Sequence, residues 1–138
     1  MHFIRLMFIF VVILGYTMMS RQQLKKTLGI MKNQCLTKTG VAEEKVINID
    51  QGAFLEERDV MCYVACIYKN IQVKKDKLDG DLISKQIDML YPQDMKESVK
   101  NAVVKCMQIQ NNYKDMCEGI FYATKCLYEA DPKNFIFA

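Results

Sequence analysis

The segment from Lys114 to Ala130 has the most informative pattern of hydrophobic and polar positions in the chain. At 100° per residue its charged residues fall within a wedge of roughly 100°, and apolar side chains cover much of the remaining circumference. A helix with so little polar surface has to be surrounded by other elements. Cys117 and Cys126 lie about 180° apart on this helix, so they cannot bond to each other, and we expect each to reach a different neighbour.

Helical spacing of apolar residues recurs in the rest of the chain, and no segment alternates with a period of two over a useful length. The pattern therefore predicts an all-α fold, a compact domain of six helices. The expected helices cover residues 20–38, a short segment from 42 that is broken at 51–52, 55–72, 82–90, a segment from 94 onward, and 114–130.

Local signals indicate where several of these helices begin or end. Gly40 suits a left-handed cap after the first helix. Asp81, which follows a turn, is the expected cap of the fourth helix, and Asp94 with Glu97 resembles a capping box that opens the fifth. Residues 110–112 are expected to form a loop before the last helix.

Residues 1–20 have the order of regions that is typical of a secretory signal peptide. Arg5 precedes the apolar run from Leu6 to Leu14, and small residues follow it. From Leu6 to Met19 there are only 14 uncharged residues, fewer than the ~20 that a membrane-spanning helix needs. We therefore predict a cleaved signal peptide over 1–20, followed by one domain over 21–138 and secretion of the mature chain.

Removal of this segment changes the composition on which function can be argued. His2 is the only histidine of the chain, so the mature chain has none. Without Arg5, 18 of the 19 Lys and Arg residues remain against 16 acidic residues, and a net charge of +2 argues against nucleic acid as a partner. A chain without histidine has no Ser-His-Asp, Cys-His or His-metal site, so we do not expect an enzyme.

All six cysteines lie in the mature part, which in a small secreted chain indicates three disulfides. Their spacing alone allows 15 pairings. Cys62 and Cys66 lie one turn apart on the third helix, so they are poorly placed to bond to each other. The mature chain has neither histidine nor a Cys-x-x-Cys pair, which argues against zinc, and we expect no cofactor.

The full cysteine spacing is C-x26-C-x3-C-x39-C-x10-C-x8-C. This spacing, together with the helix pattern, the signal peptide and the run Cys62-Tyr63-Val64-Ala65-Cys66, resembles the six-cysteine odorant-binding proteins of insects, which include pheromone-binding and general-odorant-binding members. The resemblance extends over the whole mature chain. It implies that disulfides join the first cysteine to the third, the second to the fifth and the fourth to the sixth, that is Cys35–Cys66, Cys62–Cys117 and Cys106–Cys126.

The resemblance also implies a hydrophobic cavity that is lined by the fourth, fifth and sixth helices and closed by the C-terminal tail, residues 132–138. The positions that match the family's lining are Ile87, Tyr91, Met95, Val99, Ala102, Thr124, Leu127, Phe135, Ile136 and Phe137. Helical periodicity adds Ile120 and Ala123 to the arc of Thr124 and Leu127. Each of these side chains could equally be ordinary core, because the core and the wall of a cavity share one face.

Thr124 and Tyr91 are the polar residues that we expect to orient a ligand. The expected function is carriage of small hydrophobic odorants or pheromones to receptors, by a monomer or weak homodimer in extracellular fluid such as sensory lymph, without stable insertion into membranes. Three other classes stay open: a secreted module that recognises another protein, a non-olfactory carrier of lipophilic molecules, and a membrane-active saposin-like protein.

Overall fold

The computed structural model describes residues 1–7, 9, 20–69 and 73–138. Residues 8 and 10–19 lie outside this part, and with them most of the predicted signal peptide, which therefore stays a prediction. The α-helices are α2 (Arg21–Thr39), α3 (Arg58–Lys69), α4 (Gly80–Leu90), α5 (Gln93–Cys106) and α6 (Met116–Ala130). Shorter elements are the 3-10 turns η1 (Glu43–Lys45), η2 (Ile49–Gln51) and η3 (Met107–Asn112) and the strands β1 (Val73–Lys74) and β2 (Lys77–Leu78).

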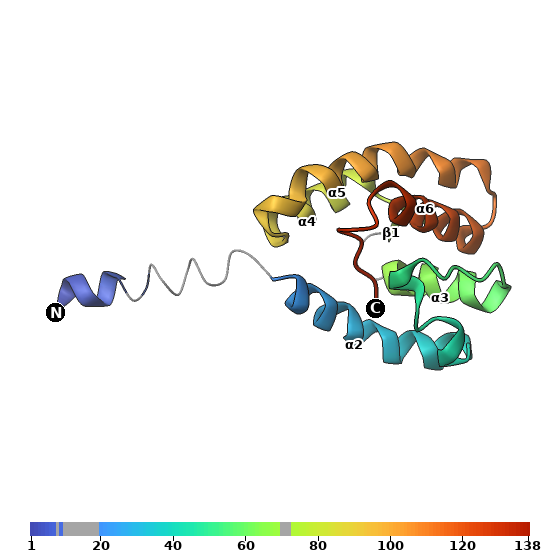
Figure 1. Cartoon of the computed structure of the whole chain (residues 1–138), viewed down its shortest axis with the longest axis horizontal. Helices are drawn as coiled ribbons and strands as arrows, with labels where there is room; N and C mark the ends of the chain where they lie inside the picture. Colours follow the sequence, from blue (N-terminus) through green and yellow to red (C-terminus); the bar gives the residue numbers. More distant parts are fainter. Residues whose placement is uncertain (8, 10–19, 70–72) are drawn as a thin grey trace.

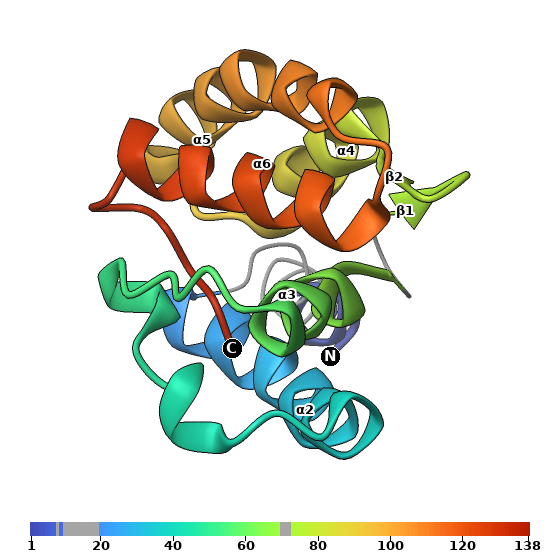
Figure 2. The same cartoon turned by 90° about the vertical axis from the view of Figure 1, so that its right-hand side faces the viewer.

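The helices form two layers, with α2 and α3 in one and α4, α5 and α6 in the other (Figure 1). The C-terminal tail leaves α6 and runs between the layers towards α2 and α3, as the view turned by 90° also shows (Figure 2). The prediction of an all-α fold is confirmed, because the strands form only a two-residue hairpin.

The three disulfides confirm the predicted pairing, and one of them ties the two layers together. Cys35–Cys66 joins α2 to α3, and Cys106–Cys126 joins the end of α5 to α6. Cys62–Cys117 crosses between the layers from α3 to α6, with Cα atoms 4.7 Å apart. Cys117 and Cys126 thus bond to different neighbours, as their opposite positions on the last helix predict.

The predicted second helix is absent as an α-helix, and the two 3-10 turns η1 and η2 stand in its place. Acidic residues of these turns pair with α2, whose own charges are all basic. Lys25 Nζ lies 2.7 Å from Asp50 Oδ2, and Lys32 Nζ lies 2.8 Å from Glu43 Oε1. Ile49, the first residue of η2, is fully buried, so the connection is packed against the core rather than free.

Several predicted helix ends differ from those of the structure. Gly40 does cap α2 in the left-handed conformation, with a φ of 68°. Asp79, not Asp81, caps α4 by accepting a hydrogen bond from the Leu82 backbone N–H at 3.1 Å. The fifth helix begins one residue earlier than expected, at Gln93, and has no side-chain cap. The third helix is expected to begin at residue 55, but α3 begins at Arg58. The last three residues of the expected helix, 70–72, lie outside the described part.

Residues 110–112, which were expected to form a loop, belong to the 3-10 helix η3, and this helix forms one unit with the hairpin. Lys75 and Asp76 both have positive φ, which lets β1 and β2 reverse within two residues. The buried Gln110 side chain of η3 accepts a hydrogen bond from the Leu78 N–H at 2.8 Å and donates one to the Leu78 carbonyl at 3.0 Å. This exchange satisfies the buried backbone of Leu78 and fixes its side chain towards the interior.

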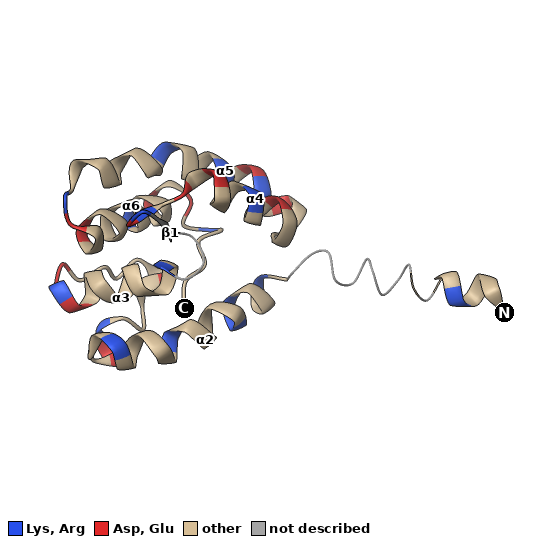
Figure 3. Cartoon of the chain, turned by 180° about the vertical axis from the view of Figure 1, so that it is seen from behind, with Lys and Arg blue, Asp and Glu red and all other residues tan. Residues whose placement is uncertain are grey.

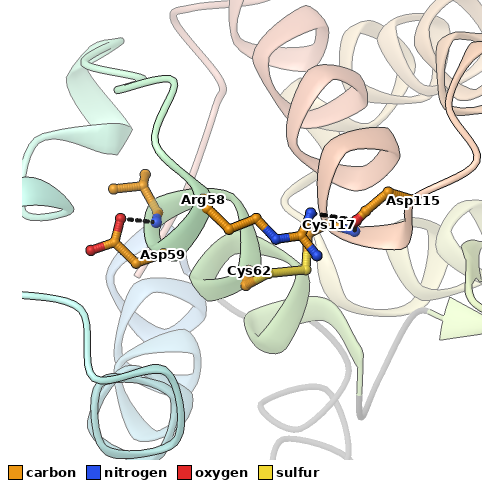
Figure 4. The surroundings of a disulfide bond; sticks show 6 residues. Arg58, Asp59, Cys62, Asp115 and Cys117 are labelled. Atoms are coloured by element: carbon orange, nitrogen blue, oxygen red, sulfur yellow. Dashed lines mark hydrogen bonds and ion pairs between the residues drawn. A yellow bond between two sulfur atoms is a disulfide. The ribbon is translucent and has the colours of Figure 1, made fainter.

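An ion pair accompanies the disulfide between the layers. Arg58 on α3 donates hydrogen bonds to the Asp115 carboxylate at 2.6 and 2.5 Å, beside the sulfurs of Cys62 and Cys117 (Figure 4). Asp115 also caps α6 by accepting from the Cys117 backbone N–H at 3.2 Å. The hydrogen bond from Arg58 is the main cause that lowers the pKa of Asp115 below its usual value.

Gly52 allows the η2 turn to dock against α6. Its φ is 92°, and a Cβ at this position would lie 2.5 Å from Tyr128 Cε1. The Tyr128 hydroxyl donates a hydrogen bond to the adjacent Gln51 carbonyl at 3.1 Å. The turn and the helix are therefore in contact at a place where only glycine fits.

Charged residues of both signs are mixed along α4 and α5 on the face seen in Figure 3. Within the described residues, no helix is long and apolar enough to cross a membrane. In the same part of the chain no group of three or more His, Cys, Asp and Glu side chains is arranged to hold a metal ion.

We expect Gly52→Ala to lower the free energy of unfolding by about 2–4 kcal/mol, because the left-handed backbone and the Tyr128 ring both oppose a Cβ. Urea unfolding measures the change. Gly29→Ala in α2 is the matched control: nothing lies within 4 Å of its added Cβ, and we expect no loss of stability. Equal stability of the two variants would contradict the close contact at Gly52.

We expect Asp115→Asn to destabilise the protein near pH 7 and to have little effect near pH 2.5. Asparagine keeps the helix cap but removes the charge. Because the folded-state pKa of Asp115 is lowered, its contribution to stability is present above the unfolded-state pKa and is lost as the pH falls through the folded-state value.

Urea unfolding at the two pH values measures this dependence. Glu97→Gln, which removes an exposed carboxylate of α5, serves as the control for a general change in charge. A loss of stability in Asp115→Asn that is the same at both pH values would contradict the role of the ion pair.

Candidate functional site

A cavity lies between the two layers. Residues from α2, α3, β2, all three helices of the other layer and the tail line it: Leu28, Tyr68, Leu78, Ile83, Ile87, Tyr91, Val99, Ala102, Val103, Leu127, Asp131, Asn134, Phe135 and Ile136. The cavity volume is about 70 Å³, and the atom-free space is about 640 Å³ when open solvent is included. The enclosed part is therefore narrow.

The wall of the cavity is mostly aliphatic. Leu, Ile, Val and Ala side chains from five elements form it, and Phe135 and Ile136 of the tail complete one side. Four polar residues interrupt this surface: Tyr68, Tyr91, Asp131 and Asn134. Such a site can bury apolar surface and offers few groups for orientation, as is usual in pockets for small molecules.

The two tyrosines are buried enough to stay neutral. Tyr68 is 8% exposed, and burial raises its pKa far above the usual value, while a hydrogen bond with Thr124 acts in the opposite direction. Burial also raises the pKa of Tyr91. Both phenols therefore keep their protons throughout the physiological range, and their hydroxyls act as hydrogen-bonding groups without charge.

The polar residues Asp131 and Asn134 of the wall bond to each other and to residues of α5 and α2. The Asp131 carboxylate accepts hydrogen bonds from the Ser98 hydroxyl at 2.7 Å and from the Asn134 amide at 3.1 and 3.2 Å. Arg21 Nη2 donates to the Lys133 carbonyl at 2.5 Å and to Asn134 Oδ1 at 3.1 Å. This network fixes the start of the tail to both layers.

Aromatic contacts hold the rest of the tail inside the protein. Phe137 is 1% exposed, and its ring centroid lies 6.3 Å from that of Tyr63 and 5.9 Å from that of Tyr68. Phe135 meets Phe54 at 6.1 Å and Tyr128 at 5.5 Å. Aromatic pairs in such edge-on and tilted geometries are favourable beyond their buried area, so the tail acts as part of the core.

The structure brings some of the expected site residues to the cavity wall and places others elsewhere. Those on the wall are Ile87, Tyr91, Val99, Ala102, Leu127, Phe135 and Ile136. Met95 is buried at a neighbouring surface groove, which Ser20, Arg21 and Lys133 also line. Phe137 lies deeper than the cavity, between Tyr63 and Tyr68.

Ile120, Ala123 and Thr124 belong to the packed core rather than to the cavity lining, each with an exposed fraction of 0–1%. The Thr124 hydroxyl donates a hydrogen bond to the Ile120 carbonyl one turn earlier, at 2.7 Å. The hydroxyl that stands on the wall near it is that of Tyr68 on α3. Periodicity identified the right face of α6 but could not tell which part of the arc faces α3.

Sequence reasoning missed several residues of the wall: Leu28, Tyr68, Leu78, Ile83, Val103, Asp131 and Asn134. Leu28 and Ile83 follow the apolar stripes of their helices, so periodicity offered a signal for them. Leu78 reaches the cavity only because Gln110 holds the hairpin in place. No local pattern in the sequence predicts the contact between Gln110 and Leu78.

Comparisons with known proteins agree on the class of this chain. The family model described as "PBP/GOBP family" matches residues 17–130. General odorant-binding protein 72 of Anopheles gambiae is 30% identical over 119 residues, which cover 86% of this chain and 98% of that protein.

Solved structures with this fold are also similar in sequence. Odorant-binding protein 5 of Apis mellifera is 30% identical with a TM-score of 0.74, and the match covers 87% of this chain and 98% of the other. Odorant-binding protein 4 of Chrysopa pallens is 29% identical with a TM-score of 0.77, over 87% and 99% of the two chains.

We expect Phe137→Ala to lower the free energy of unfolding by roughly 3–5 kcal/mol, because the ring fills a site between two buried tyrosines. Thermal and urea unfolding measure this loss. Phe137→Leu, which keeps most of the volume, should cost about 1.5 kcal/mol or less. Wild-type stability in the alanine variant would mean that the tail does not occupy the interior.

Proposed function

The chain belongs to the PBP/GOBP family, and we propose that it is a secreted carrier that binds small hydrophobic odorants or pheromones in its cavity and delivers them to receptors. The observation that carries this proposal is the narrow, mostly aliphatic cavity between two layers that disulfides hold together. Residues 1–20 act in this proposal as the signal peptide, and residues 132–138 as the segment that closes the cavity.

The binding energy in this proposal comes from removing apolar ligand surface from water, at ~25 cal/mol per Å². Binding of this kind involves no redox or acid–base step, so in this proposal the chain is a carrier and not an enzyme. The aliphatic lining, with Ile83, Ile87 and Leu127 among its members, favours a flexible aliphatic ligand over one that needs stacking on an indole or an imidazole. The same cavity would serve a non-olfactory carrier of lipophilic molecules equally well.

The ligand-binding residues that we propose are those on the wall, with the tail residues Phe135 and Ile136 as the movable part. Because Arg21 and Asp131 hold the start of the tail, ligand entry requires that these hydrogen bonds open or that the ligand passes beside them. A module that recognises another protein is the alternative, and it does not depend on the cavity.

Displacement of N-phenyl-1-naphthylamine fluorescence by aliphatic alcohols, aldehydes and esters tests the proposal. A carrier shows displacement at micromolar concentrations, at about one ligand per chain. No displacement by any compound of the series would overturn the carrier function and favour the protein-binding alternative. Delivery is tested separately, by receptor currents with and without the purified protein.

We expect Ala102→Leu to weaken ligand affinity about tenfold or more, because the larger side chain enters the narrow space that the ligand needs. The displacement assay measures the change, and urea unfolding checks that the fold is kept. Val104→Leu on the same helix is the matched control, since Val104 is 75% exposed and points away from the cavity. An unchanged affinity in Ala102→Leu would place the ligand elsewhere.

A further inference from the structure

We propose that the hydroxyls of Tyr68 and Tyr91 form a head-group subsite that selects ligands with an uncharged oxygen-bearing end, an alcohol or a carbonyl, and rejects carboxylates. The subsite rests on the proposed carrier function and names the class of ligand that the same cavity takes. Tyr68 comes from the end of α3 and Tyr91 from the residue that caps α4, so the subsite joins the two layers.

The two phenols belong to the lining of one cavity. The Tyr91 side chain contributes electrostatically to the raised pKa of Tyr68. Both rings line the cavity, whereas the side chains of Leu78, Ile87 and Val103 around them carry no polar atom. A ligand oxygen in the enclosed part therefore meets these hydroxyls as its hydrogen-bonding partners, and a hydrocarbon chain occupies the remainder.

Hydrogen bonds on the core side fix the position of the Tyr68 hydroxyl. The Thr124 hydroxyl donates to the Ile120 carbonyl at 2.7 Å, so in its hydrogen bond with Tyr68 it accepts. The Tyr68 oxygen is then left to accept from a ligand alcohol, and the Tyr91 hydroxyl is the one that can donate to a ligand oxygen, a carbonyl included. The ring of Tyr68 packs against Phe137 with centroids 5.9 Å apart. Because both ends of this side chain are held, its hydroxyl is preorganised for a ligand rather than free to follow one.

Charge explains the exclusion of carboxylates. Among the described residues that line the cavity, Asp131 is the only charged one, and it is acidic. Its oxygens already accept hydrogen bonds from Ser98 and Asn134, so the carboxylate is satisfied without a cation or a ligand donor. Arg21, which reaches the start of the tail from α2, donates to the Lys133 carbonyl and to Asn134. A buried carboxylate would thus have no countercharge and would face a negative one.

The experiment compares octan-1-ol, octanal and octanoate at pH 7.5 by displacement of N-phenyl-1-naphthylamine from the full mature chain. We expect the alcohol and the aldehyde to bind at least about tenfold more tightly than octanoate. Tyr68→Phe and Tyr91→Phe should each weaken alcohol binding about two- to tenfold and leave octanoate almost unchanged, because each removes one hydrogen bond to a neutral head.

Tyr122→Phe is the matched control, since Tyr122 lies on α6 outside the cavity lining and stacks on Tyr113. It should bind every ligand as the wild type does. Urea unfolding of all three variants separates loss of binding from loss of fold, and the double variant of Tyr68 and Tyr91 shows whether the two hydroxyls act on one head group.

The outcomes distinguish the subsite from the carrier function. If none of the three compounds displaces the probe, the carrier function itself fails. If the compounds bind but octanoate equals octan-1-ol, or if both phenylalanine variants keep wild-type affinity for the alcohol, the carrier function stands and the head-group subsite is overturned.

Discussion

The covalent crossing of α3 and α6 at Cys62–Cys117 is the constraint on which the rest of the structure depends. These two helices carry most of the fully buried side chains, and each is tied by a second disulfide to the outer helix of its own layer. A void between layers loses packing contacts that a dense core would make. In the chain-entropy model, each disulfide offsets roughly 3–4 kcal/mol of such a loss, so the framework can tolerate a cavity where close packing alone would remove it.

The cysteine framework was predictable because the intervals between the six cysteines can be read along the whole sequence. The resemblance to a known family then resolved how the cysteines pair. The amphipathic helices were predictable because the spacing of apolar residues is a local pattern. The same local patterns did not identify where the helices end. The box of Asp94 and Glu97 and the cap at Asp81 matched local rules, yet the N-cap residues of those helices are Pro92 and Asp79, since tertiary packing decides among adjacent candidates. The hairpin was not predicted, because strands of two residues are too short to show an alternating pattern.

The candidate site was predictable only in part, because a helical stripe indicates which face is buried but not what lies against it. Leu127 and Thr124 share an arc of α6, yet one lines the cavity and the other touches Tyr68 in the core. Tyr68, one of the polar residues of the wall, stands on a helix that is buried on almost every side, where no pattern separates the core from the lining. Only the relative placement of the two layers makes that distinction.

The three disulfide loops have a topological property that becomes clear from their positions along the chain. They span 35–66, 62–117 and 106–126, so each overlaps the next and together they cover the sequence from the first cysteine to the last without a gap. A protease that cuts any one peptide bond between Cys35 and Cys126 therefore leaves a single covalent molecule. In a molecule that has been cut once, the disulfides still hold the helices together. Such a molecule can continue to hold a ligand after a cut that would divide a chain without disulfides in two.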